Sequence, residues 1–209
     1  MSTILTALGE TKRDRKSERR TATRREIIDA AWQVARDKGL NQVTLRDVAD
    51  LVGMRAPSLY SHFASKNAIY DAMFGDAWMQ FWEYGKAAAA DEPRTSRAAM
   101  RFYARVYFTF AVEFPARHQL MNLRTIPDFT PSPEAYAPSV AVMEDFTARM
   151  ARHGVSRQDD IDLFVAIVGG MIDAQLANDP GGQRWAALLD RAINMFADNV
   201  GITNERSRP

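Results

Sequence analysis

Between residues 44 and 66 the sequence interleaves short polar and basic side chains with apolar ones, in a pattern that suits hydrogen bonding to a polyanion. A helix that reads a DNA groove exposes short polar side chains near its N-terminal end, keeps apolar side chains beneath, and carries donors where phosphates pass. The side chains placed for base edges are Arg55, Ala56, Ser58 and Ser61. Those placed for the phosphate backbone are Thr44, Tyr60, His62 and Lys66, with Arg46 as a further DNA-contacting candidate.

Two short helices joined by a tight turn must position these side chains. Thr44 is suited to cap a first helix, with Asp47 three residues later, and this helix ends before Gly53. A second helix begins near Ala56, with Pro57 in its first turn. Because a longer helix precedes this pair, the pattern predicts a helix-turn-helix.

The net charge of +1 hides an uneven distribution along the chain. Residues 1–70 hold 13 Lys and Arg against 8 Asp and Glu, whereas the remaining 139 residues hold 14 against 18. An excess of positive charge at one end favours contact with a polyanion. The segment 12–25 is either a solvated, disordered arm or a set of groove and phosphate contacts, for which Arg24 and Arg25 are the better candidates.

Helical spacing of apolar residues continues through the rest of the chain, without strand alternation. Helices are expected over residues 21–38, 45–52, 56–63, 66–90, 95–114, 115–123, 132–153, 156–178 and 182–200. The sequence therefore predicts an all-α fold of about nine helices. We divide it into a basic, flexible N-terminal arm (1–20), a three-helix DNA-binding head (21–66) and a helical body (67–209).

Aromatic and methionine residues are dense in the middle helices of the body. Two interpretations stay open: these residues form an ordinary core, or they line a cavity for an apolar ligand. Methionine supplies adaptable walls for such a cavity. The residues predicted to line it are Tyr103, Tyr107, Phe110, Met121 and Met143.

Several function classes are disfavoured by what the sequence lacks. It has no cysteine, no glycine-rich phosphate loop and no nucleophile motif, so neither an enzyme nor a cofactor is predicted. His118 and His153 have no metal-ligand partner at helical spacing and are expected to be structural or solvent-exposed. We expect no secretory signal, because the mildly apolar segment 1–10 precedes the basic run and offers no small-residue cleavage site. We expect no membrane span, because no apolar run reaches about 18 residues, and we expect a cytoplasmic protein.

The stretch 25–73 resembles the DNA-binding domain of the tetracycline-repressor (TetR) family without a gap. The matching positions are Gly39, Thr44, Val48, Ala49, Gly53, Lys66 and the run Ser58-Leu59-Tyr60-x-His62-Phe63. The resemblance implies that Thr44, Tyr60, His62 and Lys66 hold phosphates, and that residues 55–61 read bases. It further implies a nine-helix fold, a dimer interface made by the last two helices of each subunit, and an apolar ligand cavity in the middle helices.

The glycine pair 169–170 inside a predicted helix costs about 1 kcal/mol per residue relative to alanine, so a compensating gain is expected. Close approach of a partner helix is one explanation, and a bend that shapes the cavity is the other. With the interface implied by the resemblance, the predicted dimer residues are Phe164, Val168, Gly169, Ile172, Leu188, Leu189 and Phe196.

The function predicted from these features is a sequence-specific transcriptional regulator, in the first place a repressor, that binds a palindromic operator in double-stranded DNA as a homodimer. A small apolar or aromatic effector would release it. The alternative is an all-helical protein that binds nucleic acid without sequence preference or serves as an interaction module.

Overall fold

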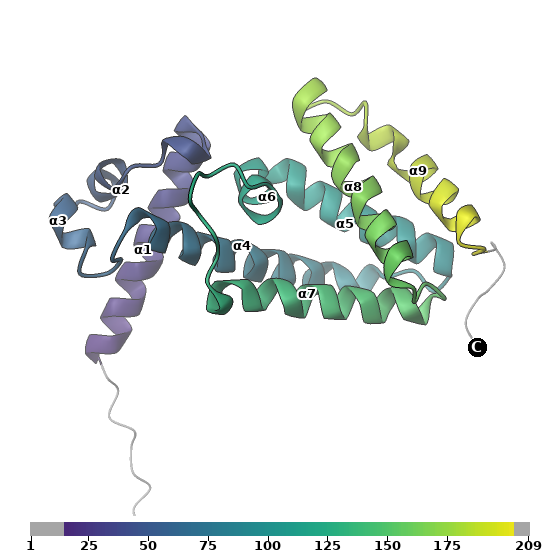
Figure 1. The fold of residues 1–209 in the computed structure, drawn as a ribbon, viewed down its shortest axis with the longest axis horizontal. Coiled ribbons are helices and arrows are strands. Elements are labelled where there is room, and N and C mark those ends of the chain that lie inside the picture. Colours follow the sequence, from purple (N-terminus) through teal and green to yellow (C-terminus); the bar gives the residue numbers. More distant parts are fainter. Residues whose placement is uncertain (1–14, 203–209) are drawn as a thin grey trace, which may run out of the picture.

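The computed structural model describes residues 15–202, which are built from helices and their connections (Figure 1). The α-helices are α1 (Arg15–Lys38), α2 (Leu45–Leu51), α3 (Ala56–Leu59), α4 (Lys66–Ala88), α5 (Ser96–Glu113), α6 (Pro115–Asn122), α7 (Pro133–Arg152), α8 (Gln158–Asn178) and α9 (Ala186–Asn199), with two short 3₁₀ helices, η1 (Leu40–Gln42) and η2 (Ala89–Asp91). The predicted all-α fold is confirmed over this range. None of these helices combines the length and apolar character that crossing a membrane needs.

Local capping residues place many of the helix ends. α1 is followed by Gly39, whose φ of +97° lies in the left-handed region that favours glycine. At the start of α2 the Thr44 hydroxyl oxygen accepts the backbone N–H of Asp47 at 3.1 Å. Ser65 and Ser132 cap α4 and α7 in the same way, at 3.1 and 3.2 Å. These ends lie close to their predicted positions because each depends on residues adjacent in sequence.

Three helix predictions differ from the structure. α1 begins at Arg15, so residues 15–20, which were assigned to the flexible arm, are helical; the rest of that arm, 1–14, lies outside the described residues. α3 ends at Leu59 and continues as turns. Pro138 was expected to delay the start of the helix predicted over residues 132–153, but α7 begins at Pro133 with Pro138 inside it. The carbonyl that the missing N–H of Pro138 leaves unbonded belongs to the exposed Glu134.

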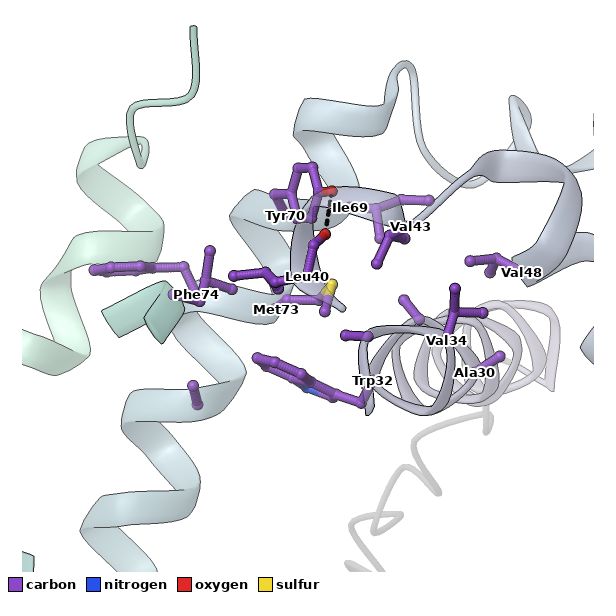
Figure 2. Close-up of a cluster of buried hydrophobic side chains, with 14 of the residues drawn as sticks. Ala30, Trp32, Val34, Leu40, Val43, Val48, Ile69, Tyr70, Met73 and Phe74 are labelled. Atoms are coloured by element: carbon purple, nitrogen blue, oxygen red, sulfur yellow. Dashed lines mark hydrogen bonds between the residues drawn. The ribbon is translucent and has the colours of Figure 1, made fainter. Parts of the chain in front are cut away.

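A first core joins the head to the beginning of α4. Figure 2 shows Trp32 and Val34 of α1 packed near Ile69, Tyr70 and Met73 of α4, and all five are buried. The Tyr70 hydroxyl donates a hydrogen bond at 2.8 Å to the backbone oxygen of Leu40, which lies in η1 just before α2. Burial raises the pKa of Tyr70 to about 12, since its ionised form would lie among apolar groups.

The first core does not stop at the end of the head. It continues to Phe110 of α5, Leu120 and Met121 of α6, and Val142 of α7. The predicted boundary between head and body after residue 66 therefore does not coincide with a boundary between hydrophobic cores. It separates only the functions proposed for the two parts.

A second core lies among α5, α7, α8 and α9, with Met150, Ile161, Phe164, Ile193 and Phe196 buried inside it. Figure 1 shows α8 and α9 side by side, far from α1–α3. Between the two ends, α4 and α7 run along each other in the same direction. Contacts at both ends fix this arrangement: Ser132 Oγ donates to Asp71 at 2.8 Å, and Arg149 donates to Glu92 at 2.5 Å.

Candidate nucleic-acid interface and ligand cavity

The turn between α2 and α3 is closed by backbone hydrogen bonds. Met54 N donates to Ala49 O at 2.9 Å and Gly53 N donates to Asp50 O at 3.3 Å, while Gly53 has a φ of +66°. Behind this turn Leu59 is fully buried, so α3 is anchored by one face. The geometry is that of a helix-turn-helix whose second helix presents its other face outward.

Most of the predicted base-reading side chains lie on this outward face. Arg55, Ser58 and Ser61 are exposed, and Ala56 is half-buried. Tyr60 is 56% exposed, next to the fully buried Leu59. The arrangement leaves a short polar surface free to meet a groove.

The other residues predicted to contact DNA differ in whether their polar atoms already have partners within the chain. Thr44 is exposed, but its hydroxyl donates to Asp47 Oδ2 at 2.8 Å while capping α2. Arg46 is exposed, with Asp50 only 4.0 Å away. Lys66 places its ammonium 5.3 Å from the Tyr70 ring centre. His62 is half-buried, and its Nδ1 has no partner among the described residues.

Two arginines predicted to touch DNA also make contacts within the chain that hold the head together. Arg24 donates to the His62 backbone oxygen, and its guanidinium lies 4.0 Å from the Phe63 ring centre. Arg25 forms ion pairs with Asp29, at 2.9 Å, and with Asp76 of α4. Their contact with DNA stays a prediction, and the intrachain partners are an additional role that the sequence could not show, because those carboxylates and carbonyls are distant in the chain.

Arg24 contacts His62 and Phe63, just after α3. The substitution Arg24→Met is therefore expected to lower the free energy of unfolding by about 1–2 kcal/mol. Methionine keeps the contact with Phe63 but loses the hydrogen bond. Urea unfolding measures the change, and Arg46→Met, on an 88% exposed side chain, is the matched control with an expected change below about 0.5 kcal/mol. The opposite outcome is unchanged stability together with a smaller salt dependence of DNA binding, by the amount expected for the loss of about one phosphate contact. It would show that Arg24 binds DNA instead of stabilising the head.

A cavity of about 300 Å³ lies between the first and second cores. One side comes from α4 and the first core, the other from α5, α7 and α8. Its aromatic lining residues are Trp78, Phe81, Trp82, Phe102, Tyr103, Tyr107, Phe146 and Phe164. This volume is at the lower end of the range for small-molecule sites.

The predicted lining is right in part. Tyr103, Tyr107 and Met143 line the cavity, whereas Phe110 and Met121 are buried in the first core. Phe110 lies in the first core instead, where its ring centre is 5.1 Å from that of Phe81, 5.5 Å from that of Tyr84 and 5.2 Å from that of Phe114. Trp78, Phe81 and Trp82 of α4 belong to the aromatic set for which core and cavity lining both stayed open, but they were not among the residues predicted to line the cavity; with Gly85 they recur at the three- and four-residue spacing of one helix face.

The charged end of the cavity is a network around Glu92. This carboxylate accepts from the Tyr103 hydroxyl at 2.6 Å and from Arg149 at 2.5 Å, and Arg149 also donates to Asp145 at 2.6 Å. Burial and the hydrogen bond to Glu92 raise the pKa of Tyr103. The network therefore keeps Tyr103 neutral and its ring fixed in the wall.

A second polar group ties the cavity to α6 and α8. Tyr107 accepts a hydrogen bond from Asn122 at 2.6 Å and lies 3.3 Å from His118 Nδ1. The other ring nitrogen of His118 lies 3.1 Å from Asp173. His118 and His153 are both buried, so the expectation of structural histidines fits their positions.

Five of the predicted dimer residues face the interior of their own chain. Phe164, Val168, Ile172, Leu189 and Phe196 are at most 3% exposed and belong to the second core. They cannot form the surface that a second copy touches, so this prediction is corrected. Leu188 is 41% exposed, and a Cβ built on Gly169 would meet no atom within 4 Å.

Comparison with known proteins gives consistent matches. Residues 27–73 match the family model of bacterial regulatory proteins, tetR family. The chain is 29% identical over 102 residues to the uncharacterized HTH-type transcriptional regulator YobS of Bacillus subtilis, covering 49% of this chain and 52% of that protein. It is 43% identical over 56 residues to the HTH-type transcriptional repressor KstR2 of Rhodococcus jostii, covering 27% of this chain and 26% of that protein.

These alignments span about half or less of the length of the curated relatives. The crystal structure of the regulatory protein SCO4313 superposes over 87% of this chain and 98% of that chain, with a TM-score of 0.67 and 22% identity. Similarity at that level shows a shared fold.

Proposed function

Because the chain belongs to the tetR family of bacterial regulatory proteins, we propose that it binds a palindromic operator in double-stranded DNA as a homodimer and represses transcription until a small molecule releases it. Such a regulator works in the cytoplasm, where the bacterial chromosome lies. The observation that carries the proposal is the outward face of α3, on which Arg55, Ser58 and Tyr60 are exposed above the buried Leu59.

A homodimer is needed because one α3 presents too few side chains to specify a long site. Two recognition helices about 34–36 Å apart enter successive major grooves and read a two-fold symmetric sequence. The surface available for pairing is the outer face of α8 and α9. Leu163, Leu188 and Met195 are 42%, 41% and 63% exposed there, and a Cβ on Gly170 would meet no atom within 4 Å.

We define this outer α8–α9 face by Leu163, Gly170, Leu188 and Met195. Leu188 and Met195 lie seven residues apart, on the same side of α9. Pairing two copies through it would form a four-helix contact related by a two-fold axis. Small residues on α8 would let the helices approach closely.

The proposed effector site is the cavity between the two cores. The first core carries α3, and the second carries the outer α8–α9 face. A ligand that fits only when these two bodies shift relative to each other would change the spacing between the recognition helices in a dimer. To move the population from 99% DNA-competent to 99% released, it must bind the released state about 10⁴-fold more tightly.

Selection of bound sequences from a pool of random duplexes tests the proposal directly. A regulator should enrich one two-fold symmetric sequence and hold it about 10³-fold or more tightly than random DNA at physiological salt. A protein that binds without sequence preference would lose affinity for both duplexes in parallel as salt rises. The absence of enrichment would refute the proposal.

Substitutions should separate base contacts from phosphate contacts. We expect Arg55→Ala to change the preferred base at one position, at a cost of about 1–3 kcal/mol for that base pair. Lys66→Ala and Tyr60→Phe should weaken binding to all duplexes similarly, and Lys66→Ala should reduce the salt slope by about one unit. Binding to a panel of single-base operator variants measures both effects, and a changed base preference in Lys66→Ala would reverse this assignment.

A further inference from the structure

The cavity wall already satisfies its own charges. Lys86, Asp145 and Arg149 are the charged side chains that line it. Arg149 donates to Asp145 at 2.6 Å and to Glu92 at 2.5 Å, and Lys86 lies 3.1 Å from Glu83. Arg149 is only 26% exposed and already paired, so an ionic ligand could use it only by breaking a partly buried pair. The Lys86–Glu83 pair is more than half exposed on both sides, so its ammonium is screened by water and compensates little for the desolvation of an ionic ligand.

The tyrosine hydroxyls of the wall are also occupied. Tyr103 donates to Glu92 at 2.6 Å, and Tyr107 accepts from Asn122 at 2.6 Å. Burial raises the pKa of Tyr107, as expected where the surroundings disfavour charge. The part of the cavity wall that remains available for contact with a ligand is therefore the surface of its aromatic rings.

The angles between the aromatic rings of the cavity wall favour a flat ligand. Phe81 and Tyr107 meet edge to face at 5.0 Å, and Tyr103 meets Phe146 edge to face at 6.2 Å. Rings held at large angles to one another offer both faces and edges to an inserted aromatic ring. A dry apolar cavity of about 150 Å³ holds one benzene, so the 300 Å³ found here suits two fused rings.

Gly85 sets the size of this space. It lies inside α4, where glycine is less favourable than alanine, and it lines the cavity. A Cβ built on it would meet no atom within 4 Å. A side chain at this position would therefore extend into open space without a clash.

From these observations we infer that the effector is an uncharged, flat, bicyclic aromatic molecule, and that Gly85 determines the size limit of its site. This inference rests on the proposed function, because it names the ligand class of the proposed effector cavity. It predicts selectivity by charge at constant shape.

Three probes with the same ring system test the charge selectivity: 2-naphthalenemethanol, which is neutral, 2-naphthoate, which is an anion, and 2-naphthylmethylammonium, which is a cation. Calorimetric titration of the full chain at pH 7.5 should show the neutral probe binding at least about tenfold more tightly than either ion. Equal or tighter binding of an ion, or no binding of the neutral probe up to its solubility limit, would overturn the inference.

Two leucine substitutions on the same helix test the location. Gly85→Leu is expected to weaken binding of 2-naphthalenemethanol at least about tenfold without lowering Tm, since leucine favours a helix more than glycine does. Ala87→Leu adds the same side chain at an exposed position and should leave binding unchanged. Equal binding by Gly85→Leu would place the ligand elsewhere.

Operator binding by the unliganded protein is measured in parallel on the selected duplex. Sequence-specific binding without the predicted probe selectivity would refute the ligand class alone. Loss of sequence-specific binding would refute the proposed function.

Discussion

The double substitution Leu188→Glu with Met195→Glu is expected to convert the proposed homodimer into folded monomers and to weaken binding to a two-half-site duplex by about 10²–10⁴-fold. In the single chain these side chains are 41% and 63% exposed, so glutamate there stays hydrated and the fold is retained. In a two-fold interface each carboxylate would be buried without a partner, and symmetry doubles that cost. Sedimentation equilibrium and binding titrations on the selected operator measure the two effects.

Two controls isolate the interface from other causes. Binding to a duplex with one half-site should change little, because a monomer contacts it with the same α3. Val140→Glu, at a 44% exposed position on α7, should leave both mass and operator affinity unchanged. A double variant that still sediments as a dimer would show that the chain pairs through another surface.

Trp32→Ala should lower the free energy of unfolding by about 3–5 kcal/mol. Trp32 is 1% exposed, its indole N–H donates to Asp76 Oδ2 at 2.8 Å, and the Arg117 guanidinium lies 4.7 Å from its ring centre. It therefore joins α1 to α4 and α6 at the point where the head meets the body. Urea unfolding followed by far-ultraviolet circular dichroism measures the loss.

Trp32→Phe separates the ring from its hydrogen bond. It keeps an aromatic ring under Arg117 but leaves Asp76 without the indole donor, and its expected cost is about 1–2 kcal/mol. A cost for Trp32→Phe as large as that for Trp32→Ala would assign the stabilisation to the hydrogen bond. A negligible cost for Trp32→Ala would show that the head is held to the body by other contacts.

The elements of the fold were predictable where local residues determine them. Thr44, Ser65 and Ser132 each cap a helix through a backbone N–H three residues away, so sequence and structure agree there. The helix-turn-helix was predictable for the same reason, since Gly53 alone supplies the left-handed residue that its turn needs. The start of α1 was not, because charged residues form a helix here without an apolar stripe to mark it.

The α8 and α9 stripes show why the interface residues were assigned to the wrong side. An apolar stripe indicates that a helix face is buried, but not whether the same chain or a second copy covers it. Here α5 and α7 of the same chain cover Phe164, Val168 and Phe196. The exposed positions Leu188 and Met195 lie on the opposite, less apolar face, where periodicity gives a weaker signal.

The cavity and the arginines depend on contacts between distant residues. Tyr107 and Phe110 lie three residues apart on α5, yet only Tyr107 lines the cavity, whereas Phe110 is enclosed in the first core by the rings of Phe81, Tyr84 and Phe114. Arg25 pairs with Asp76, fifty-one residues later in the chain. Such contacts follow from how helices cross, and charge or hydropathy at one position does not encode them.

The course of the first core also bears on how such proteins diversify by recombination. Its members come from α1–α4 and from α5, α6 and α7, so the segments that pack around the head are not contiguous in sequence. A single crossover after residue 66 would unite a foreign head with an α4 whose Ile69, Tyr70 and Met73 were fitted to another partner. Exchange of a head between two such chains is therefore expected to require matching substitutions at Ile69, Tyr70 and Met73 before the junction packs as well as it does here.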